Sequence, residues 1–333
     1  MKDILNQLFD YHALDKQQAK DTLIKLAQGD YNHSQIAAFL TVYLMRNITV
    51  KELEGFRDAM LELCIPVDFD GKSVVDLCGT GGDGKNTFNI STTASFVVAG
   101  AGQAVSKHGN YGVSSISGSS NLLEHLGYTF TNDTDHLRKS LDEANICFLH
   151  APLFHPAMKN VAPIRKELGV KTFFNMLGPM VNPAKPANQL VGVFNQELAR
   201  LYGYIYQNTH KNYSIVHTLD GYDEISLTSP SKIISNTTDT VLQAKDFGLN
   251  DLTQKDLHGG DTVGESADIF LNILQNKSND AQKNVVLANA GLTLYTCGKA
   301  DTLEASVQLA KESLESGKAY KAFKNLIELN KKL

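Results

Sequence analysis

The sequence has few cysteines and no long apolar run, and these absences exclude several classes of protein. Its cysteines form neither a CxxC pair nor a Cys/His cluster at zinc spacing, so we expect reduced thiols in a cytoplasmic protein. The sequence contains no stretch of 18 apolar residues, so no membrane span is predicted. The N-terminus lacks the basic and apolar regions of a signal peptide. The cysteines are Cys64, Cys78, Cys147 and Cys297.

Basic residues do not dominate the chain either. Lys and Arg total 31 against 36 Asp and Glu, which gives a net charge of −5. This balance argues against a nucleic-acid binder that is basic overall, although a local basic site stays open. With 333 residues, of which 42% are hydrophobic, the chain can bury a large core. Because single cores stop growing at roughly 250–300 residues, the length favours two domains.

The first 65 residues predict a helical domain. Asp15 with Gln18, and Thr49 with Glu52, have the spacing of capping boxes that begin amphipathic helices. Residues 36–45 read IAAFLTVYLM and are apolar on nearly every side. A helix of this kind must be buried. Its own bundle is the first expectation, and a dimer interface is the alternative.

Beyond Gly71 the pattern changes to short β-branched runs alternating with helical stretches. This alternation predicts βαβ units and a mainly parallel central sheet flanked by helices, an α/β fold. Six of the eight prolines fall within residues 152–186, which predicts an irregular crossing segment. Three helical stretches are expected after residue 284. The expected strands are 73–78, 104–106, 146–149, 189–193 and 213–217, with helices at 91–101 and 197–208.

Two glycine-rich loops are the strongest indication of a ligand site. They span residues 78–93 and 107–120, and each follows an expected strand, where ligands bind in open α/β sheets. Glycines allow tight turns, and the free N–H groups that follow favour an anion. Residues 84–123 contain no Asp or Glu, whereas Lys85 and Lys107 are both present. The loops therefore predict a polyanionic ligand.

A dinucleotide site is a weaker interpretation of the first loop. Gly79, Gly81 and Gly84 match the GxGxxG fingerprint, which needs a helix directly on the glycines and an acidic residue about 20 positions later. Here the helix is expected only near Ser91, and Glu124 is the next acidic residue after Asp83. Both requirements fail.

Two further segments carry candidate site residues. Asp223 and Glu224 follow the expected strand 213–217, and adjacent carboxylates suit Mg²⁺ bound together with substrate phosphates. A solvated acidic turn is the alternative. Arg165 by itself is typical of a solvated surface residue. His108 and His155 fit packing as well as catalysis, so we assign neither as a general base.

Taken together, the motifs resemble the anthranilate phosphoribosyltransferase family. The motifs occur in the order and spacing of that family, and the resemblance covers essentially the whole chain. The resemblance implies a small helical domain, residues 1–66, joined by part of residues 155–185. It also implies a larger domain, residues 72–333, that binds 5-phosphoribosyl 1-diphosphate (PRPP), with the active site between the two. The matching motifs are GTGGD at 79–83, NIST at 89–92, KHGN at 107–110, residues 155–184 and DEIS at 223–226.

The resemblance also implies an activity and its partners. The family transfers the phosphoribosyl group of PRPP to the amine of anthranilate, with release of diphosphate, in L-tryptophan biosynthesis. It implies two Mg²⁺ per subunit, one held by Ser91 and Glu224 and the other by Asp223 and Glu224. A cytoplasmic homodimer joined through the helical domain is expected, with neither nucleic acid nor membrane as a partner.

Site residues carry over motif by motif. Gly79, Asn110 and Arg165 would contact anthranilate, with Arg165 near its carboxylate. Tyr111 and Asn121 depart from the family pattern, which commonly has a basic residue and an Asp there. The residues that would bind PRPP are Gly79, Gly82, Asp83, Thr87, Asn89, Ile90, Ser91, Thr92, Lys107, His108, Gly109, Asn110, Tyr111, Gly112, Val113, Ser114, Ser115 and Ser119.

Two other functions compete with this reading. A pyrimidine-nucleoside phosphorylase shares the fold, but it differs in the loop that here reads KHGN and has no counterpart of Arg165. A non-enzymatic relative that binds nucleic acid would carry a basic surface and lose the acidic pair, whereas this chain keeps Asp223 and Glu224.

Overall fold

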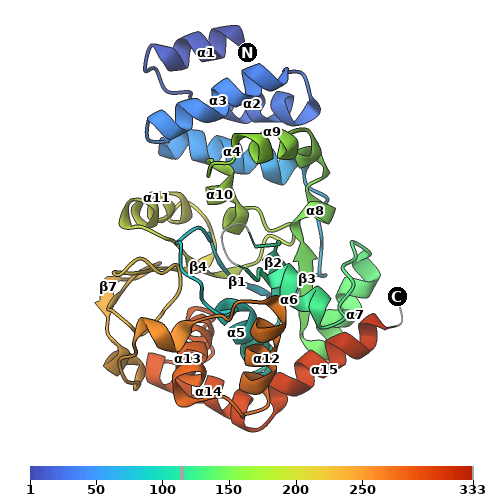
Figure 1. Cartoon of the computed structure of the whole chain (residues 1–333), viewed down its shortest axis with the longest axis vertical. Helices are drawn as coiled ribbons and strands as arrows, with labels where there is room; N and C mark the ends of the chain where they lie inside the picture. Colours follow the sequence, from blue (N-terminus) through green and yellow to red (C-terminus); the bar gives the residue numbers. More distant parts are fainter. Residues whose placement is uncertain (113–115, 332–333) are drawn as a thin grey trace. The chain divides into compact units, whose positions relative to one another are not determined.

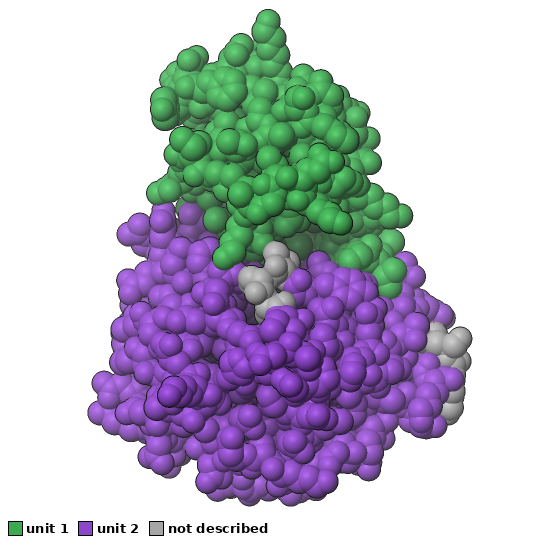
Figure 2. All heavy atoms as spheres, in the orientation of Figure 1, with its two compact units in different colours: residues 1–67, 151–185 green, residues 68–150, 186–333 purple. Residues whose placement is uncertain are grey.

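The structure is a computed structural model that describes residues 1–112 and 116–331. The chain divides into two compact units, which Figure 2 colours green and purple. Unit 1 comprises residues 1–67 and 151–185, and unit 2 comprises residues 68–150 and 186–333. In the described part of the chain, no helix is both long and apolar enough to cross a membrane.

Unit 1 is helical throughout. The capping boxes at Asp15 and Thr49 are confirmed, and a third, at Asn32 with Gln35, begins the apolar helix. The second segment of the unit adds only short helical turns, in keeping with its prolines. The elements are α1 Lys2–Phe9, α2 Lys16–Gln28, α3 His33–Met45, α4 Val50–Leu63, α8 Ala151–Phe154, η1 Pro156–Asn160, α9 Ala162–Leu168, α10 Phe174–Leu177 and η2 Gly178–Met180.

Aromatic packing joins the two segments of unit 1. Phe173 of the second segment stacks on Phe56 of α4, with 4.4 Å between ring centroids, and meets Phe39 and Tyr43 of α3 edge-on. The Asn160 side chain donates to the carbonyl of Ala27 at 2.7 Å. These contacts explain why residues 151–185 belong to the helical unit although 83 residues separate them from its first segment.

Unit 2 is built on a seven-stranded sheet of order β3-β2-β1-β4-β5-β6-β7 (Figure 1). All five predicted strands are confirmed and pair in parallel with one another. Two antiparallel strands at one edge were not predicted, because both are short and the last is largely exposed. The strands are β1 Val75–Gly79, β2 Val105–Gly109, β3 Ile146–His150, β4 Asn188–Gly192, β5 Asn212–Thr218, β6 Ser231–Ser235 and β7 Asp239–Leu242.

Helices cover the sheet, and α5 lies at the centre of the core. Nine of its eleven residues are buried, and Phe96 meets Phe148, Phe270 and Phe323 at 5.5–5.9 Å between ring centroids. The three helical stretches expected near the C-terminus are confirmed. The helices are α5 Ile90–Gly100, α6 Ser119–His125, α7 Thr134–Ala144, α11 Gln196–Tyr206, η3 Ala244–Phe247, η4 Gln254–Leu257, α12 Val263–Leu274, α13 Asp280–Thr296, α14 Leu303–Glu315 and α15 Lys318–Asn330.

The strand order fixes where a ligand is expected. After β1 the chain builds β2 and β3 on one side and then crosses to β4 on the other. The order therefore reverses between β1 and β4, where Gly79 and Gly192 are paired in register. In open α/β sheets, ligands bind beyond the carboxyl ends of the strands at such a switch point. Both glycine loops and the acidic pair follow strands at this edge.

Candidate active site

The first glycine loop has the backbone of an anion site. Gly81, Gly82 and Gly84 have φ of +66°, +79° and +74°, a region that residues with a side chain rarely adopt. The N–H of Thr80 donates to the carbonyl of Gly192 at 2.9 Å, which ties the loop to β4. Successive N–H groups in such turns form concave sites for anions.

A segment that sequence reasoning missed holds the far side of this loop. Residues 257–260 run from the last residue of η4 into the loop after it, and the N–H of Gly259 donates to the carbonyl of Asn86 at 2.9 Å. The Asn86 side chain donates to the carbonyl of Gly260 at 3.0 Å. The N–H of Phe88 donates to the carbonyl of Leu257 at 3.2 Å. Thr87 is thereby fixed between two anchored residues. Only the HGG letters at 258–260 hinted at this contact.

Two of the predicted PRPP-binding residues at the beginning of α5 have buried side chains. Ile90 and Thr92 are buried, so phosphate would reach them only through their N–H groups. The N–H of Ser91 donates to Oε1 of Glu224 at 3.2 Å. The Asn89 side chain donates to the carbonyl of Ser117 at 2.8 Å and so joins the two glycine loops.

Two residues of the predicted second loop lie in β2 instead. Lys107 and His108 are buried, and the ammonium of Lys107 donates to the carbonyl of Leu77 and lies 3.4 Å from Oγ of Ser91. Burial lowers the pKa of Lys107, while Asp76 acts in the opposite direction. This cation therefore lies behind the site, where it compensates buried acidic groups.

The rest of the second loop is held by α6. The carbonyl of Asn110 accepts from the N–H of Ser120 at 3.2 Å and from Oγ of Ser119 at 3.3 Å. Close contact with Ser119 leaves no room for a side chain at Gly109. Val113, Ser114 and Ser115 lie outside the described residues.

The two departures from the family pattern have defined contacts. Tyr111 donates its hydroxyl to Glu124 at 2.6 Å, and its ring meets His150 edge-on at 4.9 Å between centroids. The side-chain oxygen of Asn121 accepts from the N–H groups of Gly112 and Gly118 at 2.9 and 3.1 Å. An Asp oxygen would accept the same two hydrogen bonds, so Asn121 preserves the local geometry.

The acidic pair does not form a solvated turn. Asp223 is buried, and its Oδ2 accepts from the N–H of Gly81 at 2.7 Å. Burial, and then the nearby charge of Asp83, raise the pKa of Asp223. Burial and then Asp223 raise the pKa of Glu224 to about 8, although Lys107 and Ser91 oppose the shift. Both carboxylates face the first loop and the beginning of α5.

Two glycines make room for Asp223. A Cβ on Gly192 would lie 1.4 Å from the carbonyl oxygen of Asp223, and a Cβ on Gly79 would lie 2.3 Å from its Oδ2. These separations are far below contact distance, so both positions need glycine. The family resemblance predicts Gly79 as a ligand contact, whereas Gly192 lies within the expected strand 189–193 and gives no such signal.

The donor set fits a hard divalent cation. Oε2 of Glu224 is buried and has no hydrogen-bond partner among the described residues, and an unpaired buried carboxylate oxygen is costly. Within residues 1–112 and 116–331, no group of three or more His, Cys, Asp or Glu side chains is arranged to hold a metal by itself. Mg²⁺ commonly uses one or two carboxylates and takes other ligands from water and substrate phosphates.

Arg165 belongs to unit 1 and is not a freely solvated side chain. Its guanidinium lies 5.0 Å from the ring centroid of Phe174 and donates to Oδ1 of Asn175 at 3.4 Å. Burial lowers the pKa of Arg165, but an arginine stays charged. None of the ion pairs among the described residues includes it. His155 of the same unit is buried.

Comparison with known families agrees with this architecture. Residues 71–320 match the α/β domain of the glycosyl transferase family, and residues 2–64 match its helical bundle domain. The fold and site thus define a glycosyl transferase with a helical bundle and an α/β domain.

Individual relatives narrow the assignment. The chain is 62% identical to the anthranilate phosphoribosyltransferase of Flavobacterium psychrophilum over 99% of its own length and 100% of the relative. It is 52% identical to that of Bacteroides thetaiotaomicron, with both chains fully covered. The chain belongs to the anthranilate phosphoribosyltransferase family.

Solved structures agree as well. The Thermus thermophilus anthranilate phosphoribosyltransferase superposes with a TM-score of 0.92 at 31% identity, covering 98% of this chain and 99% of that one. The Saccharomyces cerevisiae enzyme in complex with PRPP and Mg also gives 0.92, at 26% identity, covering 99% and 97%.

Proposed function

We propose that this protein catalyses the transfer of the phosphoribosyl group of PRPP to the amine of anthranilate, a step of tryptophan biosynthesis. The bond between C1 of the ribose and the diphosphate oxygen breaks, and a bond between C1 and the amine nitrogen forms. Diphosphate leaves with the bonding electron pair, and the amine loses one proton. The observation that carries the proposal is the acidic pair held against the first glycine loop and the beginning of α5.

The residues have separate tasks in this reaction. Backbone N–H groups of the two glycine loops that have no partner within the protein bind the phosphates of PRPP, because concave backbone turns and helix N-termini attract anions. We assign two Mg²⁺ to the site, one held by Ser91 and Glu224 and one by Asp223 and Glu224. Mg²⁺, when bound, neutralises charge on the departing diphosphate.

The reaction does not require a strong base. An aromatic amine is neutral at pH 7 and is already a nucleophile, so its proton can leave after the new bond forms. What the protein must supply is position, and holding two reactants at near-attack distance lowers the barrier substantially. We therefore assign no acid or base role to His108 or His155, both of which are buried.

Arg165 is proposed to bind the carboxylate of anthranilate, together with contacts from Gly79 and Asn110. Its guanidinium is partly desolvated over Phe174, a setting in which a carboxylate ligand is favoured. We expect Arg165→Ala to lose about 1.5–3 kcal/mol of binding, the range for a hydrogen bond to a charged group. The loss should fall on the KM for anthranilate. An equal loss for PRPP would contradict the assignment.

The direct test follows the loss of anthranilate fluorescence after PRPP and Mg²⁺ are added to the purified protein. A fall that needs all three components is the expected result. If fluorescence does not change while PRPP still raises the melting temperature, the protein binds PRPP but anthranilate is not the acceptor. Release of a free base from pyrimidine nucleosides and phosphate would then support the phosphorylase.

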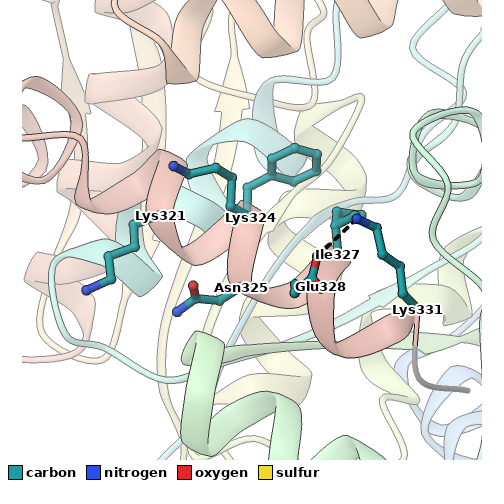
Figure 3. Close-up of a pocket in the computed structure, with 7 residues that line it drawn as sticks. Lys321, Lys324, Asn325, Ile327, Glu328 and Lys331 are labelled. Carbon is teal, nitrogen blue, oxygen red and sulfur yellow. Dashed lines mark hydrogen bonds and ion pairs between the residues drawn. The ribbon is translucent and has the colours of Figure 1, made fainter.

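Binding of nucleic acid is less well supported. The basic residues of the C-terminal helix line a shallow pocket of about 590 Å³ (Figure 3), but two of its three lysines have local partners. Lys331 pairs with Glu328 at 3.0 Å, and Lys324 lies over the ring of Tyr320. A duplex would need a longer basic surface.

We propose further that the protein is a homodimer joined through unit 1. Within the chain, α3 buries only one face, with Ile36, Phe39, Leu40 and Tyr43. Leu44 and Met45 are 45% and 83% exposed, although a helix this apolar favours burial on every side. Light scattering of the wild type and of Met45→Glu tests this proposal. All four thiols are free, as suits a cytoplasmic enzyme.

A further inference from the structure

The backbone that carries the acidic pair is held by side chains outside both glycine loops. Thr218, at the end of β5, donates its hydroxyl to the carbonyl of Glu224 at 2.6 Å, and its N–H donates to the carbonyl of Tyr222 at 3.1 Å. These contacts fix the chain on either side of Asp223. The next residue, Ile225, is held by a different helix.

Asn289 of α13 binds Ile225 through both of its backbone groups. The N–H of Ile225 donates to Oδ1 of Asn289 at 3.1 Å, and Nδ2 of Asn289 donates to the carbonyl of Ile225 at 2.8 Å. The same Nδ2 donates to the carbonyl of Val285 at 2.9 Å. Two of the three hydrogen bonds of this amide therefore hold one residue of the acidic segment, and the third ties the amide to its own helix.

The position of Asn289 is unusual for an amide. Residues 285–294 of α13 are buried without interruption, and Asn289 itself is 2% exposed. A buried amide is costly unless it is fully hydrogen-bonded. Packing alone would favour a leucine or alanine here, so the amide is explained by its contact with Ile225.

We propose that Asn289 is a positioning residue for the metal-binding carboxylates, with Thr218 as its counterpart on the other side of the pair. This inference rests on the proposed function, because it takes Asp223 and Glu224 to bind Mg²⁺. With the amide in place, the backbone at Ile225 is held to α13, and the Glu224 carboxylate stays directed toward Ser91. Without it, the backbone beside Glu224 loses this anchor and keeps the hydrogen bond from the Thr218 hydroxyl.

The chain offers a matched control for this inference. Asn330, 4% exposed, also binds one distant residue through both backbone groups. The N–H of Thr129 donates to its Oδ1 at 2.6 Å, and its Nδ2 donates to the carbonyl of Thr129 at 2.7 Å. This pair joins α15 to the segment after α6 and touches no proposed ligand of PRPP or Mg²⁺. Asn289→Ala and Asn330→Ala thus remove the same pair of hydrogen bonds to a distant residue, and Asn289→Ala also removes the bond to Val285.

The experiment measures Mg²⁺-dependent binding of inorganic diphosphate by calorimetry, and the Mg²⁺ concentration at half-maximal turnover. We expect both variants to lower the melting temperature, and Asn289→Ala alone to weaken Mg²⁺-dependent diphosphate binding about 10-fold or more, the usual effect of losing a residue that orients a metal ligand. Half-maximal Mg²⁺ should rise in parallel. An Mg²⁺ dependence equal to that of Asn330→Ala would overturn the inference.

A second variant keeps the test decisive if Asn289→Ala does not fold. Thr218→Val has nearly the same shape and removes the hydroxyl bonds to Glu224 and Ser231. It should raise the half-maximal Mg²⁺ concentration, as Asn289→Ala does. An unchanged value in folded Thr218→Val would contradict the positioning role. Wild-type protein that binds diphosphate with Mg²⁺ but does not consume anthranilate would overturn the proposed function and leave this inference standing.

Discussion

Each unit buries a glutamate carboxylate, and the two carboxylates differ in how many hydrogen bonds they accept. Glu52 of unit 1 is fully buried, and its carboxylate accepts from Leu14, Tyr43, Arg46 and Thr49. Glu224 of unit 2 accepts only from Ser91 at one oxygen, and its other oxygen has no partner among the described residues.

The difference appears in the pKa values. Burial alone would raise the pKa of Glu52, but hydrogen bonds from Arg46, Thr49 and Leu14 bring it below its ordinary value. Burial and Asp223 raise the pKa of Glu224 to about 8. A satisfied buried carboxylate supports the fold. A buried carboxylate left with a free oxygen is typical of a site that an added cation completes.

The largest effect on stability is expected from Glu52→Ala. The substitution leaves the Arg46 guanidinium partly buried without its carboxylate, and breaking such a pair costs about 3–5 kcal/mol. Urea unfolding measures the loss, and half-maximal Mg²⁺ of the folded protein should not change. Glu62→Ala, which removes a half-exposed partner of Lys20, is the control and should have little effect. Equal losses in the two variants would contradict the structural role of Glu52.

Gly192→Ala should instead damage the site. The new Cβ would lie 1.4 Å from the Asp223 carbonyl oxygen, so the acidic segment must move by an ångström or more. A displacement of that size costs about 100-fold in turnover. Gly203→Ala is the control, because its Cβ would make an ordinary 3.5 Å contact with Ile234. Near-normal turnover in Gly192→Ala would mean that the segment tolerates displacement.

Much of the fold could be predicted because its signals are local. The capping boxes at Asp15 and Thr49 are contiguous patterns, and the five parallel strands are short apolar runs that end in glycine or polar residues. The antiparallel strands β6 and β7 lie at an edge and lack that apolar signal. Their pairing is set by the neighbouring strand β5, which no local pattern indicates.

The candidate site likewise combines residues that the sequence predicts with residues that it does not. Glycine loops and the Asp223–Glu224 pair are visible in the sequence. The residues that support them are not, since Gly192, Thr218 and Asn289 act through contacts that the fold brings together. Asn289 lies 64 residues from Ile225, and nothing around it in the sequence resembles a motif. The sequence predicts residues that contact the ligand, whereas the residues that hold them in place are visible only in the structure.

The two glutamates should respond to pH with opposite sign. Folded Glu224 keeps a proton up to about pH 8, whereas the unfolded chain releases it near 4.5. The folded state therefore binds more protons over that interval, and the free energy of unfolding falls as pH rises from about 4.5 to 8. Glu52 has a lowered pKa, so its ionised carboxylate contributes fully to the stability of the fold above about pH 4.5. This contribution is lost as the pH falls below that value.

Urea titrations between pH 3.5 and 9 in the absence of Mg²⁺ test this contrast. Glu224→Gln should remove a decline on the order of 1–3 kcal/mol between pH 5 and 8, and Mg²⁺ with diphosphate should restore the stability of the wild type at the alkaline end. Glu52→Gln should reduce only the dependence of the free energy of unfolding on pH at the acidic end. Asp223, whose pKa is raised to about 7, should leave a smaller decline below that pH. An undiminished decline in Glu224→Gln would contradict the assignment to Glu224.

A third carboxylate, Glu124, completes the comparison because it is exposed. It accepts the Tyr111 hydroxyl at 2.6 Å, and water can replace that bond, so Tyr111→Phe should cost only about 0.5–1 kcal/mol. This corresponds to a two- to fivefold rise in the KM for PRPP. The ring contact with His150 is kept, and Asn121→Asp, which preserves both backbone hydrogen bonds at the same loop, serves as the unaffected control. A loss as large as that of Gly192→Ala would mean that Tyr111 contacts the substrate itself and does not merely hold the loop.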